Sequence, residues 1–139
     1  MIQGGLIEQL EFPSTMDSLS KIEVFIEGFC EQCKVSDDYY GNILIALSEG
    51  VNNAITHGNQ LDPSKKVNIY METTNKVVEF TIKDEGAGFD FNSVPDPTLP
   101  QNLEKIRGRG LFLMKNLADE VSFEDNGTIV RLTFTVVNG

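Results

Sequence analysis

The stretch "LSEGVNNAITHGNQ" (residues 47–60) decides the fold of this chain. Apolar residues in and just before it recur at about 100° per residue, the spacing of one helix face; they are Leu44, Leu47, Val51, Ala54, Ile55 and Gly58. The stretch also holds two adjacent asparagines and Gly50, which alone costs a helix interior up to about 1 kcal/mol. Sequences tend to break their own local preferences at functional or strained positions. The pattern therefore predicts a helix whose polar side has a function.

The polar side of this predicted helix places a carboxylate and an amide one turn apart. Glu49 lies almost opposite the apolar positions, Asn53 follows one turn later, and His57 one turn further. A glutamate can accept a proton or orient a nucleophile, and an asparagine oxygen can ligate a hard cation such as Mg²⁺. The alternative is a solvated polar face that binds nothing, and the helix alone leaves it open.

The composition is that of a globular domain with an acidic surface. Among 139 residues, 21 Asp and Glu stand against 11 Lys and Arg, a formal net charge of −10. This balance argues against a nucleic-acid-binding surface, since phosphate contacts need clustered basic residues. No run approaches the roughly 18 apolar residues of a membrane span, and the start "MIQGGLIEQLEF" does not resemble a signal peptide. We expect a single cytoplasmic domain over residues 1–139 that binds neither nucleic acid nor membrane.

The two cysteines form a C-x-x-C pair, Cys30 and Cys33. A structural zinc site needs four ligands, and the chain has no second pair. A redox dithiol usually follows a strand at a helix start, whereas this pair comes late in a helical pattern. We therefore expect two reduced, partly buried thiols.

Strand and helix patterns alternate along the chain. A strand pattern over residues 5–13 is followed by Ser14 and Asp17, candidate caps for a helix that runs to about Cys33. The later predicted elements are a helix from Ser36 to about His57, a hairpin of residues 65–73 and 76–84, a loop from Glu85 to about Arg107, a helix over 110–119, and a hairpin over 120–137 with an Asn-Gly turn.

This order of elements predicts an α+β fold. Strands that come in consecutive pairs, with helices before and between them, favour a two-layer sandwich with helices on one face of a mixed, mostly antiparallel sheet. The long loop contains Pro95, Pro97 and Pro100. A structureless segment of that length in a small domain is typical of a lid rather than a plain connection.

The predicted strand over 76–84 ends in a D-x-G-x-G pattern, Asp84, Gly86 and Gly88. Glycines at such an exit permit positive φ and let a ligand approach the backbone. The carboxylate can accept a hydrogen bond from an exocyclic amine, which would select a base such as adenine. The alternative is an ordinary β-turn, in which D-x-G is common.

A third pattern precedes the predicted helix over 110–119. Gly108 and Gly110 open that helix, so its free backbone N–H groups and its dipole favour an anion such as phosphate. The neighbouring basic residues, Arg107 and Arg109 among them, make this segment positive within an acidic chain. The alternative is a capped helix after a flexible basic loop.

Taken in order, the three patterns resemble the N, G1 and G2 boxes of the Bergerat-fold ATPases, which include gyrase, the Hsp90 chaperones, histidine kinases and MutL-type repair proteins. The stretches "LSEGVNNAITHGN", "IKDEGAGFD" and "RGRGLFLMKNLADEVSF…NGTIVRLTF" are most similar to the anti-sigma-factor serine/threonine-protein kinases of the RsbW and SpoIIAB type. The resemblance covers nearly the whole chain. It implies the Bergerat ATP-binding fold, with ATP between helices and sheet under a lid at about residues 90–107.

The resemblance also implies roles for individual residues. It makes Glu49 the general base, Asn53 the Mg²⁺ ligand and Asp84 the residue that recognises the adenine amino group. Gly50 stands where members of the family often have Ala, so we expect a looser helix beside Glu49. The other residues that the resemblance places around ATP are Gly86, Gly88, Arg107, Gly108, Arg109, Gly110 and Thr128.

The implied activity is phosphorylation of a Ser or Thr on an anti-sigma-factor antagonist, with ATP and Mg²⁺ as cofactors. The implied second role is to sequester a sigma factor, usually as a homodimer. One alternative is a regulatory module that binds ATP with little or no phosphotransfer. Another alternative is a detached histidine-kinase catalytic domain. The sequence supports this alternative less, because the predicted elements leave no room for a phosphoacceptor helical hairpin.

Overall fold

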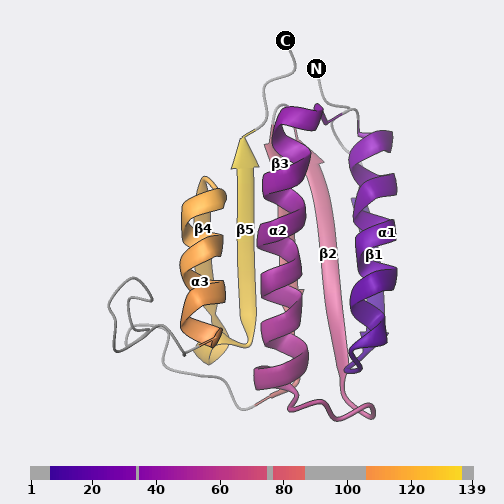
Figure 1. Cartoon of the computed structure of the whole chain (residues 1–139), viewed down its shortest axis with the longest axis vertical. Coiled ribbons are helices and arrows are strands. Elements are labelled where there is room, and N and C mark those ends of the chain that lie inside the picture. The colour runs from indigo at the N-terminus through magenta and orange to yellow at the C-terminus, as the bar shows by residue number, and fades with distance from the viewer. Residues whose placement is uncertain (1–6, 34, 75–76, 87–105, 136–139) are drawn as a thin grey trace.

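The computed structural model describes residues 7–33, 35–74, 77–86 and 106–135 (Figure 1). The predicted helices and strands are present there in the predicted order, together with two short helical turns that were not predicted. They are β1 (Ile7–Pro13), α1 (Asp17–Gln32), α2 (Asp37–Asn53), the π-helical turn η1 (Ala54–Gly58), β2 (Lys66–Thr74), β3 (Val77–Lys83), α3 (Ile106–Leu117), β4 (Glu120–Glu124), the 3-10 turn η4 (Asp125–Gly127) and β5 (Ile129–Thr135).

The five strands form one sheet in the order β1-β2-β3-β5-β4, and every pairing between these described strands is antiparallel. The α+β prediction is confirmed, but the prediction of a mixed sheet is wrong for this part of the chain. The physical reason is local pairing. Strands β2 and β3 form one hairpin, β4 and β5 form another, and the two hairpins join through β3 and β5, which run in opposite directions.

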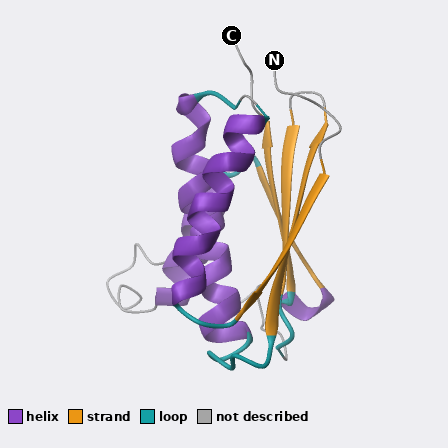
Figure 2. Ribbon diagram, turned by 90° about the vertical axis from the view of Figure 1, so that its right-hand side faces the viewer, coloured by secondary structure: helices purple, strands orange, loops and turns teal. Residues whose placement is uncertain are grey.

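The helices cover one face of the sheet, so the fold has two layers (Figure 2). Side chains of β3 alternate between the two faces, and Val78, Phe80 and Ile82 are buried under the helices. The Phe80 ring packs edge-to-face against Phe29 of α1 and Phe134 of β5, with 5.9 Å between ring centroids in each pair. None of the described helices combines the length and hydropathy needed to cross a membrane.

Helix α2 lies between α1 and α3 and packs on the sheet (Figure 1), and at Gly50 it has no room for a side chain. A Cβ added to Gly50 would lie 2.6 Å from Ile82 Cδ1 and 3.1 Å from Met114 Sδ. Ile82 and Met114 are both fully buried, so neither has free space to move into. Gly50 therefore serves packing, and the looser helix expected beside Glu49 stays a prediction.

The start of α1 differs from its predicted capping. Met16 is the N-cap residue and makes no side-chain cap, and Asp17 is already the first helical residue. The Ser14 hydroxyl is buried and donates instead to the Lys65 carbonyl, at 2.7 Å. Ser14 thus joins the β1–α1 connection to the segment that enters β2.

The turn of the second hairpin is longer than the predicted Asn-Gly turn. Glu124 pairs with Ile129, so four residues connect the strands. Asp125 and Gly127 have positive φ, 52° and 87°. The Thr128 hydroxyl donates to the Asp125 carbonyl at 2.8 Å and closes the 3-10 turn. The hairpin itself is confirmed.

The two cysteines are free and buried, as predicted. Cys30 belongs to α1 and Cys33 is its C-cap residue. Burial, with a smaller contribution from neighbouring Cys33, raises the pKa of Cys30 to about 12. Burial and then the Glu8 carboxylate raise the pKa of Cys33 to about 11. Both thiols therefore stay protonated at neutral pH, which agrees with a structural role.

Candidate functional site

The described parts of the three sequence patterns lie at the same end of the sandwich. Here α2 and η1 finish, β3 finishes, and β2 and α3 begin (Figure 1). We call this the motif end. Glu49 and Asn53 belong to the last turns of α2, and Asp84 follows β3 directly. The antiparallel sheet makes this convergence possible, because β3 must run back toward the end at which β2 started.

Two glycines let η1 press against the turn that follows β3. A Cβ on Gly58 would lie 2.5 Å from Asp84 Cγ, and a Cβ on Gly86 would lie 2.6 Å from the Gly58 carbonyl carbon. The Gly86 amide donates to Asp84 Oδ1 at 2.8 Å. The close contact of Gly86 is therefore with the end of η1, and the approach of a ligand to this backbone stays a prediction.

Thr128 lies beside Asp84, although 44 residues separate them in the chain. The Asp84 amide donates to the Thr128 carbonyl at 3.0 Å. The carboxyl of Asp84 is largely buried, with only 9% of the residue exposed. A buried carboxylate beside an open backbone turn can select a ligand by the donors that the ligand presents.

Asn53 is a buried polar residue without an internal partner. It is 7% exposed, and neither Oδ1 nor Nδ2 has a hydrogen-bond partner among the described residues. An unpaired buried polar group costs about 1–3 kcal/mol and calls for an explanation. Glu49, one turn earlier on α2, is partly exposed. Among the described residues, the arrangement thus combines a buried amide oxygen without a hydrogen-bond partner and a carboxylate that solvent or a substrate can reach.

The donor set around Asn53 fits a weakly held magnesium ion. In the described residues, no group of three His, Cys, Asp or Glu side chains is arranged to hold a metal. Magnesium commonly takes only one or two protein ligands and completes its shell with water and substrate phosphates. The single Asn53 oxygen is therefore compatible with an ion that enters together with a nucleotide.

The third pattern is described only in part. Arg107, Gly108, Arg109 and Gly110 lie in the first five residues of α3, which begins at Ile106. Gly108 belongs to the first turn, where amides lack intrahelical partners, but Gly110 is the fifth helical residue. The prediction that both glycines open the helix is therefore wrong for Gly110.

The remaining predicted positions fall outside the described residues. These are Gly88 and most of the proposed lid at about 90–107. Only its last two positions, 106 and 107, are described, and both belong to α3.

Sequence reasoning missed Asn59, which follows η1 and is completely buried. Its Nδ2 donates to Ser14 Oγ at 2.8 Å and to the Lys66 carbonyl at 3.0 Å. Its Oδ1 accepts a 2.7 Å hydrogen bond from the Glu85 amide. The only signal in the sequence was an asparagine after a helix-ending glycine, a pattern typical of an ordinary helix C-terminus.

Residues 12–134 match the model of the histidine kinase-like ATPase domain. The chain belongs to this family. Because the match covers most of the chain and includes the motif end, the resemblance inferred from the three sequence patterns is confirmed. An ATPase domain of this kind implies that ATP binds.

Curated relatives narrow the comparison to one branch. The chain is 34% identical to the anti-sigma F factor of Bacillus subtilis over 129 residues, which cover 89% of this chain and 88% of that protein. It is also 34% identical to the anti-sigma F factor of Geobacillus stearothermophilus, over 88% of each chain. It is 27% identical to the serine-protein kinase RsbW of Staphylococcus aureus, over 90% of this chain and 84% of that one.

A solved structure supports the fold. The crystal structure of the RsbU and RsbW domains of a Mycobacterium tuberculosis protein superposes with a TM-score of 0.71, covering 96% of this chain and 33% of that one. The identity is 16%, so this likeness concerns the fold alone.

Proposed function

We propose that this protein is a Mg-ATP-dependent serine/threonine-protein kinase that acts as an anti-sigma factor. It phosphorylates an anti-sigma-factor antagonist and sequesters a sigma factor. The observation that carries the proposal is the unpartnered amide of Asn53, buried one turn after the reachable carboxylate of Glu49. The names of the relatives, an anti-sigma factor and a serine-protein kinase, support the same activity.

In this proposal the motif end binds the nucleotide through residues from all three patterns. Asp84 accepts from the adenine amino group, with Thr128 and Gly86 beside it. Asn53 ligates Mg²⁺. The remaining contacts are assigned to Gly88 and, at the start of α3, to Arg107, Gly108, Arg109 and Gly110. Residues 90–107 form the lid of a single domain.

Glu49 is the proposed general base. Its carboxylate accepts the hydroxyl proton of the substrate Ser or Thr while that oxygen bonds to the γ-phosphorus. The bond between the γ-phosphorus and the bridging oxygen breaks, and ADP leaves. Bound magnesium would neutralise phosphate charge. The partial exposure of Glu49 supports this role, because a protein substrate must reach it from solvent.

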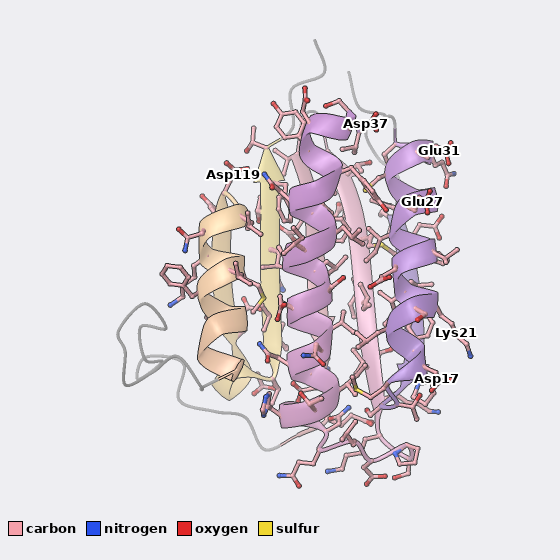
Figure 3. The ribbon with its side chains drawn as sticks, in the orientation of Figure 1. Asp17, Lys21, Glu27, Glu31, Asp37 and Asp119 are labelled. Atoms are coloured by element: carbon pink, nitrogen blue, oxygen red, sulfur yellow. The ribbon has the colours of Figure 1, made fainter. Side chains whose placement is uncertain are left out.

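The test of this role is phosphate transfer from labelled ATP to a co-purified antagonist. Glu49→Gln keeps the size of the side chain, so ATP affinity should change little while transfer falls about 10²–10⁴-fold. Glu27→Gln is the matched control, since Glu27 is an exposed glutamate of α1 away from the motif end (Figure 3). Transfer by Glu49→Gln at the parent rate would exclude Glu49 as the base.

The second candidate function is a regulatory module with little or no phosphotransfer. The motif end supports it equally, because a site that binds ATP need not transfer its phosphate. A parent protein that holds a sigma factor but never transfers phosphate would establish it. Sigma-factor binding is measured on the same samples as phosphate transfer. We expect the protein to be a cytoplasmic homodimer that contacts neither membrane nor nucleic acid directly.

Base selectivity tests the nucleotide site separately from the chemistry. Guanine carries an oxygen where adenine carries its amino group, so a GDP complex would set two acceptors against each other at Asp84. That conflict costs about 1–3 kcal/mol, or roughly 5- to 150-fold in affinity. Equal calorimetric affinities for ADP and GDP would refute the assignment of Asp84.

A further inference from the structure

A hydrogen-bonded ring centred on the fully buried Asn59 includes Glu85, the exposed residue that follows Asp84. Asn59 Nδ2 donates to the Lys66 carbonyl, the Lys66 amide donates to the Glu85 carboxylate, and the Glu85 amide donates back to Asn59 Oδ1. The ring thus joins the residue after η1, the first residue of β2 and the turn after β3. Each main-chain segment is fixed to the other two by a hydrogen bond.

Asn59 also contacts the connection between β1 and α1. Its Nδ2 donates to Ser14 Oγ, and Ser14 in turn donates to the Lys65 carbonyl through both its amide and its hydroxyl. Ser14 and Asn59 are both fully buried. The β1–α1 connection is therefore held to the turn after β3 through a single amide side chain.

The position of this ring bears on base recognition. Glu85 is the residue after Asp84, and Gly58, which presses against the Asp84 carboxyl, is the residue before Asn59. Asn59 thereby fixes the chain on both sides of the contact between Gly58 and Asp84. A carboxylate discriminates between an amine and a carbonyl only when it cannot swing aside, so its selectivity depends on how firmly this contact is held.

We propose that Asn59 is a positioning residue that sets the base selectivity of Asp84. The proposal rests on the proposed nucleotide-binding function and deepens it. Asn59 acts through the Glu85 amide and Gly58. With the side chain removed, the turn after β3 loses its acceptor, the Asp84 carboxyl can retreat, and the preference for adenine falls.

The first test uses amide hydrogen exchange in the full-length protein without nucleotide. In the parent, the Glu85 amide should exchange slowly. In Asn59→Ala it should exchange at least about tenfold faster, while the Ile82 amide in β3 stays protected. A Glu85 amide that exchanges freely in the parent would overturn the proposal, and this measurement needs no variant to fold.

The second test compares calorimetric affinities for ADP and GDP. Asn59→Ala should lower the ratio of the two affinities about tenfold, whereas Asn42→Ala, an exposed asparagine of α2, should leave it unchanged. A merely structural role would weaken both nucleotides alike and leave the ratio intact. An unchanged ratio in Asn59→Ala therefore overturns the proposal.

Two further outcomes are separable. A parent that binds neither nucleotide refutes the proposed function itself, whereas a parent that prefers ADP, with Asn59→Ala preferring it equally, refutes only the role of Asn59. If Asn59→Ala does not fold, the exchange rate of the Glu85 amide in the parent decides the proposal: slow exchange supports it, and free exchange overturns it.

Discussion

Substituting alanine for Gly50 should destabilise the protein, although alanine is the better helix former. The helix gains up to about 1 kcal/mol from the change. The new methyl group, however, would lie 2.6 Å from Ile82 Cδ1 and 3.1 Å from Met114 Sδ, both in the close-packed core. Overpacking of this kind costs about 1–3 kcal/mol. The net change in the free energy of unfolding is therefore a loss of about 0–3 kcal/mol.

Gly41 provides the matched control for this prediction. It lies in the same helix, is exposed, and has no atom within 4 Å of an added Cβ. Gly41→Ala should therefore show only the helix-propensity gain, a stabilisation of up to about 1 kcal/mol. Because that gain is common to both variants, their difference isolates the overpacking, about 1–3 kcal/mol. Urea unfolding of both variants measures it. Equal stabilisation of the two would refute the packing account of Gly50.

The buried thiols and the contact between Gly86 and η1 lead to three further predictions. Cys30 and Cys33 should resist a thiol reagent near neutral pH in the folded protein and react once it is unfolded, because burial raises both pKa values. The free energy of unfolding should fall as pH rises from about 9, where free thiols ionise, toward about 11 to 12, since only the unfolded thiols ionise readily there, and alanine at both positions should remove this fall. Gly86→Ala should weaken ADP binding at least about tenfold, because its methyl group meets the Gly58 backbone, which cannot rotate away, whereas Gly28→Ala on the open surface of α1 should not. Retained ADP affinity in Gly86→Ala would contradict the close contact with η1.

The sequence predicts the elements of this fold well because each has an unambiguous period. In β3, Val78, Phe80 and Ile82 alternate with outward residues, and the structure buries all three. The predicted stop of the second helix at Gly58 also agrees with the end of η1, although the change to a π-helical turn after Asn53 was not predicted. The failures concern contacts between elements. Whether Gly50 marks a ligand or a neighbouring side chain depends on how closely α2 approaches Ile82, and no local pattern encodes that distance.

The predicted start of α3 was wrong for the same reason. Glycine is a poor helix former, so Gly108 and Gly110 predicted the opening of the helix rather than its interior. The helix nevertheless begins at Ile106, because α3 packs along α2 and buries Met114. Tertiary packing supplies most of the stability of a short helix and can offset the helix-propensity cost of two glycines. Propensity alone therefore placed the boundary too late.

The residues of the candidate site also differ in whether the sequence alone could identify them. Asp84 and Gly86 were identifiable because a carboxylate and a glycine at a strand exit have recognisable chemistry, and Asn53 because it breaks a helical pattern. Asn59 has no such signal: its role depends on three hydrogen-bonding partners that the chain brings in from Ser14, Lys66 and Glu85. The residues that touch a ligand can thus be recognised one by one, whereas those that hold them in place are defined only by the fold. The orientation of Asp84 should therefore depend on residues that no short motif contains. The exchange rate of the Glu85 amide measures this dependence.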